Sequence, residues 1–150
     1  MTLFIQLASA VIGTVGFAIL FKVRTKYLYL AAIGGGVGYG IYYLFVETLG
    51  ISSFVGAIVS VTFIAGFSEI SARAARAPAP VFLLPCLITI VPGGNLYYAV
   101  RGLISNDSQS ALKYGLEALK IGLGIAGGIL IVSVSINLIR GIAEHMKKKE

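Results

Sequence analysis

Hydrophobic residues are grouped into long segments along this chain, and the few charged residues lie mostly in the connections or after the last segment. The five segments span about residues 3–21, 27–46, 51–67, 81–104 and 117–139. Each is close to the ~20 residues with which an α-helix crosses a bilayer core. Strand-like alternation is absent, and backbone groups in lipid must be paired internally, so the segments are predicted to be helices. The expected fold class is an all-α integral membrane protein with one five-helix domain over residues 1–150.

Basic residues are distributed unevenly over the connections. If the chain crosses the membrane five times, nine of the 12 Lys and Arg residues fall on one side: Lys22, Arg24, Lys26, Arg73, Arg76, Arg140, Lys147, Lys148 and Lys149. Arg101, Lys113 and Lys120 fall on the other side. The positive-inside rule then predicts an N-terminus outside and a C-terminus in the cytoplasm. We therefore expect a multi-pass protein of the cytoplasmic membrane.

The overall composition agrees with a membrane protein. Hydrophobic residues make up 57% of the chain, charged residues 12%, and the mean hydropathy is +0.93. A soluble domain carries about 25% charged residues, and disorder requires low hydrophobicity, so both classes are excluded. The net charge of +6 comes from residues that flank apolar segments, which favours the lipid bilayer and not nucleic acid as the partner.

Glycines are frequent within the apolar segments. Several of the 19 glycines are spaced four residues apart in the second and fifth segments: Gly34 and Gly38, Gly36 and Gly40, and Gly124 and Gly128. Small residues at this spacing allow helix backbones to approach closely in lipid. We expect these positions to be helix contacts within the bundle or between subunits.

The fourth segment contains residues that interrupt a helix. Pro85 is expected to kink it, and Pro92 followed by Gly93 and Gly94 is expected to break it. The stretch Val81–Val91 has 11 residues, or roughly 16 Å of helix, which places the break near the midplane of the membrane. The fourth helix is therefore predicted to be broken at Pro92-Gly93-Gly94.

A break at that depth exposes backbone groups, which are tolerated only beside protein or a water-filled cavity. Secondary transporters direct such a half-helix N-terminus at an anionic group of the substrate. On this interpretation the candidate substrate-binding residues are Thr89, Pro92, Gly93, Gly94, Asn95 and Tyr98. The other open interpretation is a proline-glycine kink that only shapes the bundle.

A charged cluster follows the third segment. Glu69 and Arg73 are four residues apart and are expected to pair across a helical turn, with Arg76 close by. Two interpretations are open: the cluster anchors the helix at the membrane interface, or it forms a gate at the cytoplasmic entrance of a transport path.

Residue types that indicate catalysis are scarce. The one histidine, His145, lies in the C-terminal tail, and no apolar segment contains an acidic pair. We therefore expect neither an enzyme with catalytic residues nor a metal or other cofactor.

Four stretches occur in the order of a known family signature: Glu69 to Pro80, Phe82 to Pro85, Val91 to Gly94, and Leu96 to Tyr98. In these stretches the chain resembles the threonine/serine exporter (ThrE-like) family, specifically its short second module. The glycine-rich second and last segments fit as well. This chain has Thr89 where family members often have proline, and Asn95 where they often have a small residue.

The resemblance implies secondary active export of small carboxylate-bearing metabolites, namely threonine and serine or, for split members, dicarboxylates. It also implies a hetero-oligomer in which a short chain works with a larger membrane subunit that carries a cytoplasmic N-terminal domain. Five helices per module would place two modules in opposite directions, as in inverted-repeat transporters. The alternatives are a structural or assembly subunit that supports a larger partner, and a homo-oligomeric exporter or channel.

Overall fold

The computed structural model describes residues 2–147, and every regular element in that range is helical. The α-helices are α1 (Thr2–Leu20), α2 (Leu28–Tyr43), α3 (Ser53–Ala75), α4 (Pro80–Leu87), α5 (Gly93–Ile104) and α6 (Ser108–Lys147). A 3₁₀-helix, Thr25–Tyr27, precedes α2, and a π-helix, Leu44–Thr48, follows it. The predicted all-α class is confirmed. Lys148 and Lys149, which were expected on the basic side of the membrane, lie outside the described residues.

Among the described residues, four helical segments are long and apolar enough to cross a membrane. They are Leu3–Leu20, Thr25–Thr48, Ser53–Ala75 and Ser108–Ile139. The other expected span, 81–104, is divided between α4 and α5, and neither helix alone has the length of a span. A total of five crossings therefore depends on α4 and α5 acting together as one.

Two helices extend beyond the segments expected from hydropathy. Helix α3 continues past Phe67 to Ala75, because its last turns still bury small residues such as Ser71 and Ala72. Helix α6 begins at Ser108, where the Asp107 side chain accepts a hydrogen bond from the Ser110 N–H at 3.1 Å and caps the helix. Hydropathy marks the lipid-facing part of a helix, whereas caps and neighbouring helices determine where it ends.

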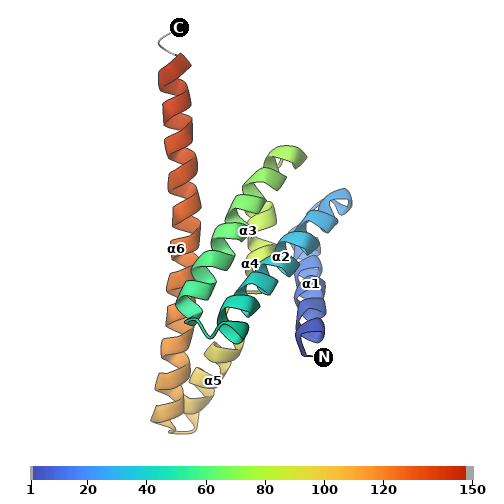
Figure 1. Ribbon diagram of the computed structural model, residues 1–150. Coiled ribbons are helices and arrows are strands. Elements are labelled where there is room, and N and C mark those ends of the chain that lie inside the picture. The colour runs from blue at the N-terminus through green and yellow to red at the C-terminus, as the bar shows by residue number, and fades with distance from the viewer. Residues whose placement is uncertain (1, 148–150) are drawn as a thin grey trace.

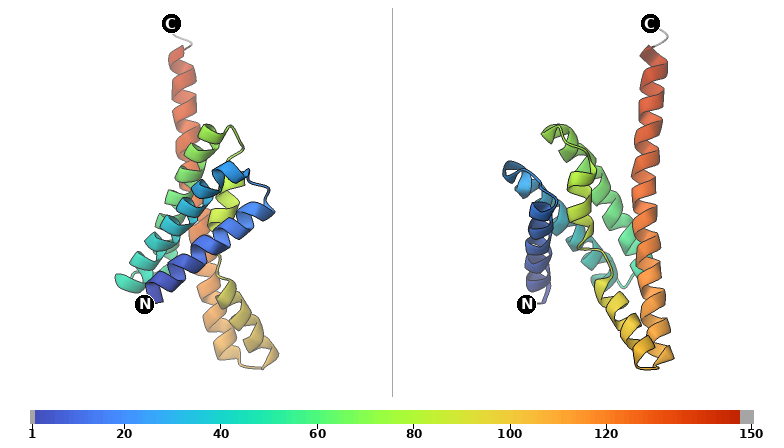
Figure 2. Two further views of the ribbon diagram at one scale, coloured as in Figure 1. Left: turned by 90° about the vertical axis from the view of Figure 1, so that its right-hand side faces the viewer. Right: turned by 180° about the vertical axis from the view of Figure 1, so that it is seen from behind.

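The helices alternate in direction if α4 and α5, which run the same way, are taken as one segment (Figure 1). The C-terminus, the α1–α2 connection and the α3–α4 connection lie at one end, and the N-terminus and the α5–α6 connection lie at the other (Figure 2). The α5–α6 hairpin extends beyond the rest of the molecule at the N-terminal end. The connections that were expected to share a side of the membrane therefore share an end of the bundle.

Close helix packing is concentrated on glycines and small residues. Helix α6 packs along α3, where Gly124 and Gly128 lie against the α3 backbone. Helix α2 packs on α3 through Gly38, whose carbonyl accepts a hydrogen bond of 2.7 Å from the buried Ser60 hydroxyl. The expected role of the spaced glycines as helix contacts is thus seen at these positions, whereas Gly40 has only an ordinary contact with Leu7.

The two halves of the fourth segment have different surroundings. Helix α4 is packed among α1, α2 and α3, and Phe82 and Cys86 are fully buried there. Helix α5 leaves this group and packs against α6 (Figure 1). The break between them therefore lies where the chain passes from the interior of the bundle to its edge.

Candidate functional site

The helical break lies between Leu87, the last residue of α4, and Gly93, the first residue of α5. The unwound stretch is therefore residues 88–92, which corrects the predicted site in one respect. Of the four residues expected to be unwound, only Pro92 is outside a helix, and Gly93, Gly94 and Asn95 form the first turn of α5.

The prolines explain these boundaries. Pro85 lies inside α4 and has no N–H to donate, so the helix is weakened and ends two residues later. Pro92 is the N-cap of α5, with a φ of −78° that suits a helix start. The Gly93 N–H donates to the Val91 carbonyl at 2.8 Å, which tightens the turn into α5. The glycines thus follow the unwound stretch and do not form it.

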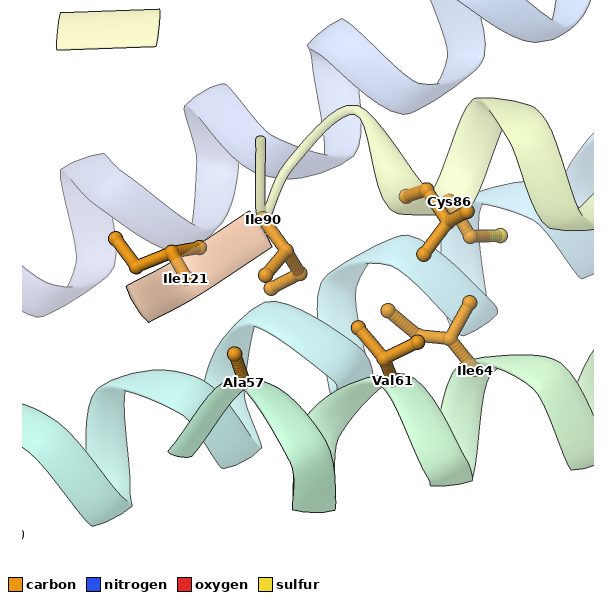
Figure 3. Close-up of a cluster of buried hydrophobic side chains, with 7 residues drawn as sticks. Ala57, Val61, Ile64, Cys86, Ile90 and Ile121 are labelled. Atoms are coloured by element: carbon orange, nitrogen blue, oxygen red, sulfur yellow. The ribbon is translucent and has the colours of Figure 1, made fainter. Parts of the chain in front are cut away.

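Ile90 anchors the unwound stretch to the bundle. Its side chain is only 3% exposed and packs in a cluster with Ala57 of α3, Cys86 of α4 and Ile121 of α6 (Figure 3). Ala57 lies in the second turn of α3, so the break is beside the part of α3 near the N-terminal end of the bundle. The break is therefore held in a defined position.

Several backbone groups at the break lack partners among the described residues. No backbone donor reaches the carbonyls of residues 88–90, and the N–H groups of Gly94 and Asn95 have no backbone acceptor. No side chain caps α5. These are the carbonyl and N–H groups that a broken membrane helix leaves for a substrate, an ion or water.

A pocket of about 380 Å³ lies beside the break, between α1, α2 and the end of α4. Thr89 lines it, and its hydroxyl donates to the Cys86 carbonyl at 2.8 Å. Three further polar residues line the same pocket: Gln6 and Ser9 of α1 and Tyr39 of α2. Sequence reasoning missed these three. Gln6 and Ser9 are polar residues three apart in an apolar segment, and that spacing was an available signal.

The other predicted substrate-binding residues do not line this pocket. A Cβ atom added at Gly93 or at Gly94 would meet nothing within 4 Å, so both glycines border open space. Asn95 is half-buried and Pro92 is half-buried. The structure therefore brings Thr89 into a pocket, whereas Gly93 and Gly94 border open space and do not line that pocket.

Tyr98 belongs to a different pocket. Its ring lies 5.2 Å from the ring of Tyr114, and both line a polar pocket of about 330 Å³ in the α5–α6 hairpin, together with Arg101 and Asp107. Hydrogen bonds from Ser110, first from its hydroxyl and then from its backbone N–H, hold the pKa of Asp107 below its ordinary value of 3.8. The structure thus separates Tyr98 from Thr89.

The charged cluster is assembled at the opposite end of the bundle. Glu69, Arg73 and Arg76 line one pocket of about 500 Å³. The Arg73 Nη2 atom lies 3.8 Å from Glu69 Oε2, as their spacing indicated. Arg76 ends α3 in the left-handed conformation, with a φ of 50°, which turns the chain toward α4. The three residues therefore meet at the connection between α3 and α4.

Comparison with known proteins gives one match. A family model described as threonine/serine exporter, ThrE, matches residues 6–135. The matched range contains the break, the charged cluster and all residues that line the pocket beside the break except Ile5. No curated protein and no solved structure matches this chain.

Proposed function

This chain belongs to the threonine/serine exporter family, and on that premise we propose that it is the small subunit of a secondary active transporter. The family makes it a multi-pass membrane protein of the exporter type, in agreement with its apolar helices. We propose further that it lies in the cytoplasmic membrane and exports amino acids such as threonine and serine, or small dicarboxylates. A larger subunit with a cytoplasmic N-terminal domain supplies the second module.

The observation that carries this proposal is the break between α4 and α5. Among the described residues, the carbonyls of residues 88–90 and the N–H groups of Gly94 and Asn95 have no backbone partner. The pocket beside the break is lined mostly by apolar residues but includes four polar side chains. A substrate with a carboxylate satisfies the N–H groups at the start of α5, where the helix dipole also favours negative charge. Pro92, Gly93, Gly94 and Asn95 then form the backbone part of the site, and Thr89 contributes a hydroxyl.

The positions of the charged cluster support a path from the cytoplasm. In the proposed orientation the C-terminus and the α3–α4 connection face the cytoplasm, so Glu69, Arg73 and Arg76 lie at the entrance. Arg73 is 63% exposed, and its guanidinium remains available to an incoming carboxylate because its contact with Glu69 is long. Tyr98 lies toward the opposite end, where it takes part in release.

Reconstituted transport tests the proposal. Proteoliposomes that contain this chain and the candidate larger subunit are loaded with labelled threonine or succinate, and efflux is measured. We expect flux only with both subunits, and lower flux for Thr89→Val, Asn95→Leu and Arg73→Gln. Gly122→Ala is the control, because a Cβ at Gly122 meets nothing within 4 Å and the residue lines none of the pockets described above.

The same measurement separates two further functions. Flux that requires this chain but is unaffected by all three substitutions indicates a structural or assembly subunit. Flux from this chain alone indicates a homo-oligomeric exporter or channel. The proposal of a transport-path subunit fails in either case.

A further inference from the structure

The pocket beside the break is distinguished by polar side chains that lack partners. Gln6, Ser9 and Tyr39 line it, and none of the three takes part in a side-chain hydrogen bond among the described residues. Polar side chains in membrane helices are costly unless they face a partner or a water-filled cavity. Their convergence on one pocket from α1 and α2 therefore points to a ligand.

Hydroxyl side chains elsewhere in α1 and in α6 show the contrast. Thr14 donates to the Ala10 carbonyl at 2.8 Å, and Ser135 donates to the Ile131 carbonyl at 2.7 Å, each within its own helix. Ser9 makes no such bond, although its position in α1 offers a carbonyl one turn earlier. Ser9 is exposed and its hydroxyl has no partner among the described residues, so it is accessible to a molecule in the pocket.

The lining also restricts the charge of that molecule. All nine residues that line the pocket are uncharged. A dicarboxylate brings two negative charges, and the removal of water from them is expensive without a cation. A zwitterionic amino acid has no net charge, and it needs both donors and acceptors. Amide and hydroxyl side chains supply both.

We propose that Gln6, Ser9 and Tyr39 complete the substrate site that begins at Thr89, and that this uncharged pocket selects a zwitterionic amino acid over a dicarboxylate. The assignment rests on the proposed function and names three residues that determine specificity. Gln6 and Ser9 are three residues apart, so they present their side chains on one face of α1. Tyr39 closes the pocket from α2.

Transport kinetics in proteoliposomes with both subunits tests the assignment, with labelled threonine and succinate as probes. We expect wild-type protein to prefer threonine. Gln6→Leu, Ser9→Ala and Tyr39→Phe each remove one hydrogen bond to the substrate, so the KM for threonine should rise about two- to tenfold while the maximal rate changes little. Ser135→Ala is the matched control, because it removes an equal hydroxyl that is bonded within α6, and its KM should stay at the wild-type value.

A charge substitution tests the selectivity directly. Gln6→Arg places a cation at the pocket, and we expect the ratio of succinate to threonine transport to rise relative to wild type. Co-purification of the larger subunit with each variant measures assembly. A lower yield of complex with an unchanged KM means that a partner helix fills the pocket, which overturns the assignment.

The remaining outcomes distinguish the two proposals. Threonine flux with an unchanged KM in all three variants, or a wild-type preference for succinate, overturns the pocket assignment and leaves the exporter proposal standing. No flux of either probe from wild-type protein with its partner overturns the proposed function, and the assignment with it.

Discussion

Gly128 in α6 and Gly94 in α5 are both helical glycines, but their surroundings are opposite. A Cβ atom at Gly128 would lie 2.9 Å from the Ile58 carbonyl oxygen and 3.0 Å from the Thr62 nitrogen, so α3 leaves room only for hydrogen there. A Cβ atom at Gly94 would meet nothing within 4 Å. Neither glycine has a positive φ. Packing within the chain therefore explains Gly128 and does not explain Gly94.

The difference separates two kinds of region. The α3–α6 contact is complete within this chain, because backbone lies on backbone and the Val61 side chain is fully buried. The start of α5 is open, because the N–H groups of Gly94 and Asn95 have no backbone acceptor among the described residues and a Cβ at Gly94 would meet nothing within 4 Å. Substitutions in the first region should act on stability, and substitutions in the second should act on transport.

Gly128→Leu should have the largest effect. The new side chain would displace the α3 backbone, and overpacking of this kind costs about 1–3 kcal/mol or more. We expect a lower melting temperature in detergent and less folded protein in size-exclusion chromatography after heating. Gly122→Leu is the matched control on the same helix, since nothing lies within 4 Å of its added Cβ. Equal melting temperatures for the two variants would show that the α3–α6 contact does not depend on glycine.

Gly94→Leu should abolish export and leave assembly intact. The added side chain finds space in the single chain, so the melting temperature should match that of wild type. It would occupy the space in front of the unpaired N–H groups and exclude a carboxylate. Efflux from proteoliposomes and co-purification of the larger subunit measure the two effects separately. Normal efflux would remove the start of α5 from the transport site.

Much of this contrast could be predicted from the sequence, because it depends on local chemistry. Glycines spaced four residues apart predicted close contacts between helices, and the prolines predicted a break in the fourth segment. The unwound stretch at residues 88–92 was not predicted, although Pro85 and Pro92 explain its boundaries. Its position in the bundle was not predictable either, because Ile90 packs beside Ala57, which lies far away in the sequence. The residue pattern of one helix does not reveal which residues of another helix pack against it.

The site was less predictable than the fold for the same reason. Thr89 was expected as a ligand from its place near the break, and it does line a pocket. Gln6 and Tyr39 reach that pocket from other helices, and Tyr98 lies in another pocket because α5 turns toward α6. The position of a break can be predicted from one sequence, whereas the residues that surround the break are determined by tertiary packing.

Ser60 and Ser68 on α3 allow the same comparison, between a group that is paired within the chain and one that is not, at the level of single hydroxyls. Both are buried, but the Ser60 hydroxyl donates to the Gly38 carbonyl at 2.7 Å, whereas the Ser68 hydroxyl has no partner among the described residues. Ser60→Ala should cost about 0.6 kcal/mol, the average for a hydrogen bond between membrane helices. Ser68→Ala should cost nothing or stabilise slightly, because it removes an unpaired polar group. Thermal unfolding in one detergent compares them, and a larger loss for Ser68→Ala would indicate a partner for that hydroxyl in the assembled protein.

Asp107→Asn should have only a small effect, and it tests whether the far end of α5 is a packed region although its start is open. Gly102 lies against the backbone of Ala111, and Asp107 caps α6 at this turn. The Asp107 pKa is lowered in the folded protein, so its charge stabilises the fold above its ordinary pKa of 3.8, and this contribution is lost as the pH falls through the lower folded value. Wild-type protein should therefore melt slightly above the variant at neutral pH, and the difference should shrink as the pH falls through the lowered pKa of Asp107. Export at neutral pH should be unchanged in the variant, because the turn is remote from the break. A difference that persists at low pH would mean that the amide fits the cap less well than either form of the carboxyl.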